Sequence, residues 1–82
     1  MTQSGGGVSQ PRTTTVDVQD MLCAQALAVV AQALARVAVG EWIDVAWNGD
    51  DVRRDLVAWA ADRGHRYAEV PNARTLRIRR DR

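Results

Sequence analysis

The chain of 82 residues has very few of the side chains that carry out chemistry in enzymes. It contains no lysine, one cysteine (Cys23) and one histidine (His65). The absence of lysine excludes Schiff-base catalysis, which needs a lysine amine, and a single cysteine excludes an internal disulfide. A four-ligand zinc site would need carboxylates beside Cys23 and His65, so we expect no metal and no cofactor. Cys23 is therefore the only strong nucleophile of the chain.

The chain also lacks long apolar segments and an excess of charge of either sign. No run of 18 or more apolar residues occurs, and residues 1–7 lack the basic and apolar regions of a secretory signal. From these absences we expect a cytoplasmic protein with no membrane partner. The 11 arginines and 10 acidic residues leave a net charge of +1, which argues against nucleic acid as the partner.

The N-terminal part of the chain differs in composition from the rest. Residues 1–14 are mainly Gly, Ser, Thr and Gln, and Val8 is their only large apolar residue after Met1. Such a segment cannot bury a core, so we expect a disordered tail over 1–14 and one domain over 15–82. A domain of this size buries only roughly 60% of the surface of its unfolded chain, so a partner interface would help to stabilise it.

Two segments have the apolar period of a helix. Residues 22–37 place apolar side chains at spacings of four, three, four and three, with Asp20 as a candidate N-cap. A second helix begins near Asp50 and Asp51, whose carboxylates suit a helix N-terminus, and ends before Gly64. Its inner stripe comprises Val52, Leu56, Trp59, Ala60 and Arg63.

Four segments read as strands. They are residues 15–18, 42–47, 65–70 and 75–79, and the last two are joined by a short loop at 71–74. The order is β-α-β-α-β-β, which predicts an α+β fold: a two-layer α/β sandwich with a four-stranded mixed sheet. The chain is too short to cover two faces, so both helices should pack on one face and leave the other open.

Cys23 stands at the start of the first helix, directly after a loop. Unpaired backbone N–H groups and the positive end of the helix dipole favour the thiolate there, which predicts a lowered pKa and a reactive sulfur. Asp20 opposes this effect, because a nearby carboxylate disfavours a thiolate. The same position also suits a free cysteine that only fills space.

Residues 16–23 read VDVQDMLC, with hydrophobic-Asp-hydrophobic at the start and a cysteine at the end. At these positions they resemble the opening motif of the TusA/SirA-type sulfur-carrier proteins, hydrophobic-Asp-hydrophobic-Arg-Gly-x-x-Cys-Pro-x-Pro. The resemblance continues at residues 40–45 (GEWIDV), at the helix 51–61 with its central aromatic residue, and at 64–70 (GHRYAEV). It covers about 65 residues, and it implies the same fold as the order of elements does.

The chain departs from the family at its most specific motif. Gln19 and Asp20 stand where the family has Arg-Gly, and residues 23–26 read Cys-Ala-Gln-Ala instead of Cys-Pro-x-Pro. Proline in the first turn of a helix pre-sets φ and lacks an N–H that would be unpaired. The two alanines are compatible with a helix start, and we expect that start to be less rigid.

The resemblance implies a function in sulfur transfer. In that family the cysteine accepts sulfur as a persulfide and passes it to the next protein of a relay, so Cys23 would be the catalytic residue of a carrier rather than of a turnover enzyme. The implied partners are a sulfur donor of the desulfurase or rhodanese type and a sulfur acceptor.

Three other candidates fit structural roles better. The resemblance places His65 at the far end of the second helix from Cys23. Asp17 matches a family position and is expected to order the loop before Cys23. Asp44 with Asp50 and Asp51 could suggest a metal site, but acidic residues at a helix start normally cap it.

The open sheet face supplies the alternative function. Residues 74–82 hold five arginines, and strand alternation places Arg77 and Arg79 on the open face. We also expect Trp42 and Tyr67 on this face, with Ala68 facing inward. Aromatic residues beside arginines are common in binding surfaces, so these four residues predict a protein partner or self-association. The alternatives are a non-catalytic interaction module, a nucleic-acid interface, and an edge strand that is protected by charge.

Overall fold

The computed structural model describes residues 14–82, so residues 1–13 of the expected tail lie outside the described part of the chain. Six elements follow in the expected order: β1 (Thr14–Asp17), α1 (Cys23–Arg36), β2 (Trp42–Ala46), α2 (Asp50–Asp62), β3 (Arg66–Val70) and β4 (Thr75–Arg79). Their ends differ from the expected ones by about a residue, which is the usual fraying of element boundaries. Thr14, expected in the tail, is the first residue of β1.

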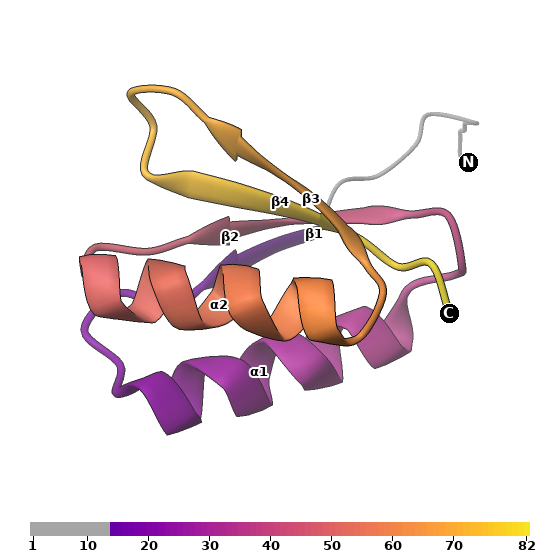
Figure 1. Ribbon diagram of the computed structural model, residues 1–82, viewed down its shortest axis with the longest axis horizontal. Helices are drawn as coiled ribbons and strands as arrows, with labels where there is room; N and C mark the ends of the chain where they lie inside the picture. Colours follow the sequence, from indigo (N-terminus) through magenta and orange to yellow (C-terminus); the bar gives the residue numbers. More distant parts are fainter. Residues whose placement is uncertain (1–13) are drawn as a thin grey trace, which may run out of the picture.

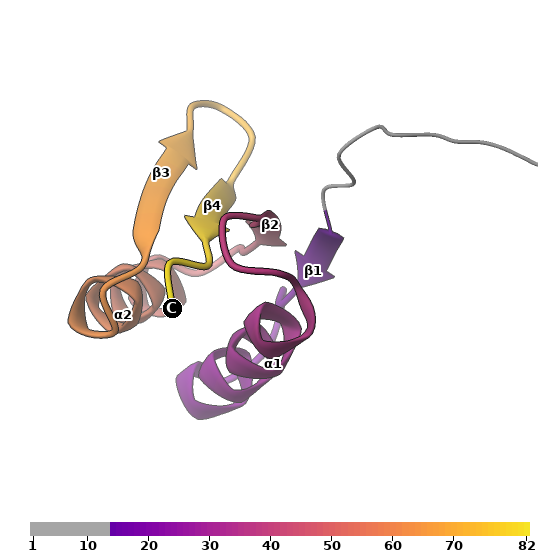
Figure 2. The same ribbon diagram turned by 90° about the vertical axis from the view of Figure 1, so that its right-hand side faces the viewer.

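The sheet is mixed and has the strand order β1-β2-β4-β3. β1 pairs with β2 in parallel, and β4 pairs antiparallel with both β2 and β3. Both helices lie on the same face of this sheet (Figures 1 and 2). The two-layer α+β sandwich is therefore confirmed, and no element of residues 14–82 covers the other sheet face.

The core lies between the helices and the sheet. Each helix buries three residues at positions i, i+4 and i+8: Ala26, Val30 and Leu34 in α1, and Val52, Leu56 and Ala60 in α2. The strands alternate, and Ile43, Val45, Leu76 and Ile78 are fully buried. Each fully buried Val, Leu or Ile stabilises the fold by about 1.5–3 kcal/mol. No polar or charged residue of the described chain is buried.

The expected faces of Tyr67 and Ala68 are wrong. Tyr67 lies opposite Ile78, whose side chain faces the helices, and Ala68 lies opposite Arg77 on the open face. Directly opposite residues of an antiparallel pair share a face, so Tyr67 does not share the open face with Trp42. β3 is an edge strand whose residues are almost all exposed. Apolar and polar residues therefore do not alternate along it in a way that shows which side chains face the helices.

No helix within residues 14–82 is both long enough and apolar enough to cross a membrane.

Candidate functional site

Cys23 is the first residue of α1 and is half-buried at the edge of the core. The residue before it, Leu22, is the N-cap and is 75% exposed. Two hydrogen bonds at Leu22 fix the helix start: its N–H donates to Gln25 Oε1 (3.2 Å), and its carbonyl accepts from the Ala26 N–H (2.9 Å). A proline at position 26 could not make the second bond. This bond therefore offsets the loss of rigidity expected from the missing prolines.

Asp20 is not the N-cap of α1, contrary to expectation. It lies in the left-handed region with φ of 63°, where glycine is favoured. Asp tolerates this conformation better than most residues. Its N–H donates to Asn48 Oδ1 (3.0 Å), and Asn48 Nδ2 donates to Asp20 Oδ1 (2.8 Å). This reciprocal pair joins the loop before α1 to the loop before α2.

The loop pair places the thiol next to the start of α2. β1 and β2 run parallel and each leads directly into a helix, so both helices begin at the same edge of the sheet. The Cys23 Sγ lies 4.0 Å from Asp51 Oδ2, and Asp55 lies one turn further along α2. From the sequence, Asp51 is predicted only to cap α2, and Asp55 is not among the candidate site residues. Recognising β1 and β2 as parallel neighbours would have indicated that both carboxylates meet the thiol.

These carboxylates reverse the expected acidity of the thiol. The hydrogen bond with the Asp55 carboxylate raises the pKa of Cys23 above its ordinary value, and partial burial and the charges of Asp55 and Asp51 raise it further. A backbone hydrogen bond at Cys23 itself lowers the pKa, as expected at a helix N-terminus, but this effect is the smallest of those present. The prediction of a lowered thiol pKa is therefore wrong.

The other expected site residues have structural contacts. His65 Nδ1 accepts a hydrogen bond from the Asp81 N–H (3.1 Å), and its ring lies 5.8 Å from the Trp59 ring, near the C-terminal end of α2. Asp17 Oδ1 accepts from the Gln19 N–H (2.9 Å), which orders the loop leading to Cys23. Among residues 14–82 there is no group of three or more His, Cys, Asp or Glu side chains that could hold a metal ion.

The open sheet face carries three of the four residues expected to bind a partner. Trp42 lies opposite Arg79 and is 36% exposed. Arg77 Nε donates to Asp44 Oδ1 (2.9 Å) on the neighbouring strand, and Arg79 Nε lies 3.3 Å from Asp81 Oδ1. The arginines of this face are therefore partly neutralised by acidic neighbours. The described part of the face is mixed in charge rather than strongly basic.

Comparisons with known proteins identify the fold. No family model matches the sequence, and no curated protein matches it. Among solved structures, the crystal structure of a SirA-like protein from Desulfitobacterium hafniense is similar, with a TM-score of 0.70 and 23% sequence identity. The match covers 85% of this chain and 100% of that chain. The resemblance found in the sequence is thus confirmed in three dimensions, and the chain has the fold of this SirA-like protein.

Proposed function

We propose that the protein is a sulfur carrier that accepts sulfur as a persulfide on Cys23 and relays it to a partner protein. The observation that carries this proposal is the position of the only cysteine, at the first residue of α1 in a SirA-like fold. Leu22 supports it, because this exposed apolar side chain beside the thiol offers a contact for a docking protein. We place the reaction in the cytoplasm, where thiols are kept reduced.

The transfer needs only one sulfur atom from this chain. The Cys23 thiolate attacks the outer sulfur of a donor persulfide, the sulfur–sulfur bond of the donor breaks, and the donor cysteine leaves as a thiolate. The proton lost by Cys23 is regained by that leaving thiolate. A thiol and a persulfide therefore exchange one sulfur atom with no net oxidation. The release step repeats the same exchange with an acceptor thiol.

The acidic surroundings of Cys23 set a condition on the donor. Asp55 and Asp51 raise the pKa of the Cys23 thiol, so a smaller fraction of it is the reactive thiolate in the free protein. A donor that brings a cationic side chain to these carboxylates would lower the thiol pKa at the moment of docking. We therefore expect the donor to be basic around its persulfide. The carrier would then be activated only in the complex.

Mass spectrometry of the intact protein tests the proposal. The full chain is incubated with a cysteine desulfurase and cysteine, and separately with glutathione persulfide as a donor without a docking surface. We expect a gain of one sulfur atom at Cys23, faster with the protein donor, and no gain on the Cys23→Ser variant. The absence of any adduct on the unmodified chain with either donor would refute the proposal.

The second candidate is a non-catalytic interaction module that binds through the open sheet face. The raised thiol pKa favours it, because the free cysteine is not activated. The uncovered face, with Trp42 next to Arg79 and Arg77, supplies a surface for such binding. This candidate requires that Trp42→Ala or Arg77→Ala weakens partner binding while Cys23→Ser does not. The sulfur carrier instead requires that Cys23→Ser abolishes sulfur transfer, whereas Trp42→Ala and Arg77→Ala leave it intact.

A further inference from the structure

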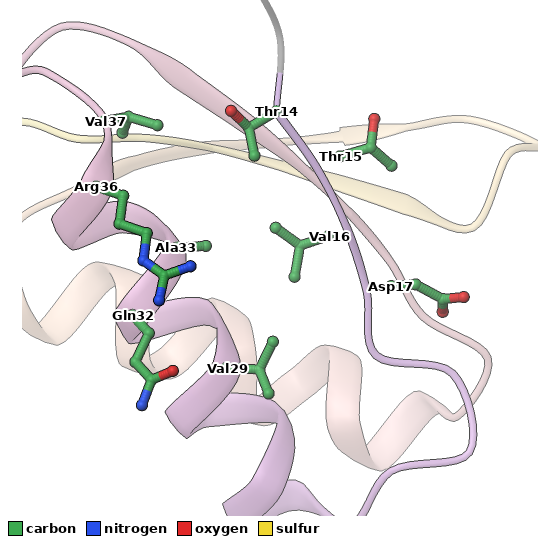
Figure 3. Close-up of a pocket in the computed structure, with 9 residues that line it drawn as sticks. All are labelled: Thr14, Thr15, Val16, Asp17, Val29, Gln32, Ala33, Arg36 and Val37. Carbon is green, nitrogen blue, oxygen red and sulfur yellow. The ribbon is translucent and has the colours of Figure 1, made fainter.

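A pocket of about 190 Å³ lies between the C-terminal halves of α1 and α2, and we call it the helix-end pocket. Both helices end on the side of the molecule where the C-terminus is marked (Figure 1). Three arginines line this pocket, Arg63, Arg80 and Arg82, and no acidic residue of the described chain does. The groove between β1 and α1 differs, because its charged side chains, Arg36 and Asp17, have opposite signs (Figure 3). Only the helix-end pocket of these two hollows therefore carries a net charge.

The positive charge of the helix-end pocket is not neutralised by carboxylates. Other arginines of the chain form ion pairs, but Arg63, Arg80 and Arg82 form none with an acidic side chain of residues 14–82. Asp81 stands between two of them in the sequence, and its carboxylate pairs with two arginines outside the pocket. A hollow lined by charge of one sign concentrates counter-ions, so this pocket attracts anions.

Arg80 compensates the negative end of α1. Its Nη1 donates to the Val37 carbonyl (2.6 Å) and lies 3.4 Å from the Ala35 carbonyl, and its Nε donates to the main-chain oxygen of Arg82 (2.8 Å). Carbonyl groups at a helix C-terminus carry partial negative charge, which would repel an anion. Because Arg80 binds these oxygens, it offsets the repulsion. Arg63 and Arg82 remain available to a ligand.

Gly64 makes room for the Arg82 guanidinium. It lies in the left-handed region with φ of 77°, and a Cβ at this position would lie only 3.1 Å from Arg82 Nε. The guanidinium therefore packs directly against the glycine backbone. The N–H groups of Gly64 and His65 donate to the Ala61 (3.1 Å) and Ala60 (2.9 Å) carbonyls. The last carbonyls of α2 are thus also satisfied, and they do not compete for Arg82.

His65 and Trp59 complete the lining of the helix-end pocket. His65 Nδ1 accepts a hydrogen bond from the Asp81 N–H (3.1 Å), so the neutral imidazole carries its hydrogen on Nε2 and can donate it. The Arg63 guanidinium carbon lies 5.7 Å from the centre of the Trp59 ring, and this cation–π contact orients it. The pocket therefore combines two oriented guanidinium groups with one neutral donor.

We propose that the helix-end pocket binds a phosphate group, either as the free ion or as part of a small phosphate ester, through Arg63, Arg82 and His65. The planar guanidinium donates two parallel hydrogen bonds, which match two oxygens of a phosphate. Pockets for larger organic ligands have volumes of about 300–1,000 Å³, so this smaller one suits the phosphate and leaves an ester group outside. Cys23 lies at the opposite end of α1, so the site does not depend on the proposed sulfur transfer.

Nuclear magnetic resonance of the full chain tests the site. Sodium phosphate is added at neutral pH while sodium chloride keeps the ionic strength constant, and the amide and arginine Nε–H signals are followed. We expect saturable shifts at Gly64, His65 and Arg82, with a dissociation constant of about 1 mM. Chloride alone should not shift these signals. Sulfate has the same shape and should bind to the same residues.

Two variants of the pocket and one control make the test specific. Arg63→Gln and Arg82→Gln each remove charge-assisted hydrogen bonds, so we expect each to weaken phosphate binding about tenfold. Both residues are exposed, and the spectrum itself shows whether the variants fold. Arg54→Gln is the matched control, because Arg54 is an exposed arginine of α2 that does not line the pocket. It should bind phosphate as the unmodified chain does.

Glycerol 3-phosphate distinguishes the two sources of the phosphate group. Binding as tight as that of inorganic phosphate assigns the pocket to small phosphate esters, and binding of inorganic phosphate alone assigns it to the free ion. Shifts that grow linearly with concentration without saturating would overturn the proposal. So would an Arg54→Gln variant that loses as much affinity as the two pocket variants. A hexaglutamate peptide that binds at these residues where phosphate does not would also overturn it, and would assign the arginines to an acidic protein surface.

Discussion

The two helices pack on the core in the same way, but they differ in the side chains that they expose. Each buries three residues at the same spacing of four. Outside the core, α2 carries six charged residues among thirteen, while α1 carries only Arg36 among fourteen. Arg53 of α2 pairs with Asp50 of its own helix (3.6 Å) and with Glu69 of β3 (3.1 Å). α1 makes no such pairs within the described residues, and apart from Arg36 its exposed residues are alanines and glutamines.

This difference separates two tasks of the helices. Packing on the sheet needs only the buried stripe, and both helices supply it equally. α2 adds the carboxylates that control the thiol, whereas α1 supplies the thiol and an almost uncharged surface beside a free strand edge. A helix with so few charges gains little from exposure to water. The proposed function thus places the start of α1 against a partner protein, and the carboxylates of α2 raise the pKa of the cysteine that α1 carries.

The largest expected effect tests whether the two helices contribute equally to the stability of the core. Leu34 of α1 and Leu56 of α2 are 3% and 0% exposed, so truncating either to alanine leaves a cavity. We expect Leu34→Ala and Leu56→Ala each to lower the free energy of unfolding by about 2–5 kcal/mol, measured by urea denaturation. Small domains have roughly 5 kcal/mol in total, so both variants should be partly unfolded.

Leu22→Ala is the matched control for these two variants. The Leu22 side chain is 75% exposed, and its truncation should change the free energy of unfolding by less than about 0.5 kcal/mol. If Leu34→Ala lowered the free energy of unfolding no more than Leu22→Ala does, α1 would contribute less to the core than α2.

The next effect tests whether α2 controls the thiol of α1. Replacing Asp55 and Asp51 by asparagine removes the charges that raise the pKa of Cys23. We expect the double variant to react several-fold to about tenfold faster with iodoacetamide near neutral pH, because its thiolate fraction is higher. The rate is measured as a function of pH, so that the pKa is obtained directly.

Asp62→Asn controls for the change in net charge. Asp62 is the last residue of α2, at the other end of the helix from the carboxylates near Cys23. Its removal should leave the pKa of Cys23 unchanged. Equal acceleration by Asp62→Asn and by the double variant would mean that total charge, rather than contact with α2, sets the reactivity.

The sequence predicted the core and the order of elements because both depend on periodic apolar residues. The stripes through Val30, Leu34 and Leu56 and the inward Leu76 and Ile78 follow from spacing alone. The edge strand β3 has no such signal, and there the faces of Tyr67 and Ala68 were predicted wrongly.

The environment of Cys23 could be predicted only in part. The helix N-terminus is a local feature, and its effect on the thiol has the expected sign. Asp51 and Asp55 are far from Cys23 in the sequence and act through space, so they required the parallel pairing of β1 and β2 to be known. The hydrogen bonds between Asp20 and Asn48 depend on the same pairing.

A smaller effect tests the link between the two helix starts. Asn48→Ala removes both hydrogen bonds to Asp20, which stands in a left-handed conformation that these bonds stabilise. We expect a loss of about 1 kcal/mol in the free energy of unfolding. The loop before α1 should also loosen, so Cys23 should move away from α2 and react faster with iodoacetamide. A variant that loses stability without any gain in thiol reactivity would show that the loop pair does not position Cys23.

The smallest expected effect is a loss of stability at alkaline pH, caused by ionisation of the Cys23 thiol beside the carboxylates of α2. The pKa of Cys23 is raised in the folded protein, so the folded state holds the thiol proton more tightly than the unfolded state does. The resulting stabilisation is fully present below the pKa of the unfolded thiol, about 8.5, and is lost as the pH rises through the folded value. Cys23→Ser has no proton to lose, so its stability should fall less between neutral and alkaline pH, measured by urea unfolding at each pH. Tyr67 and the arginines are present in both proteins, so the difference between the two curves reports Cys23 alone. Parallel curves would mean that the carboxylates of α2 do not act on the thiol of α1.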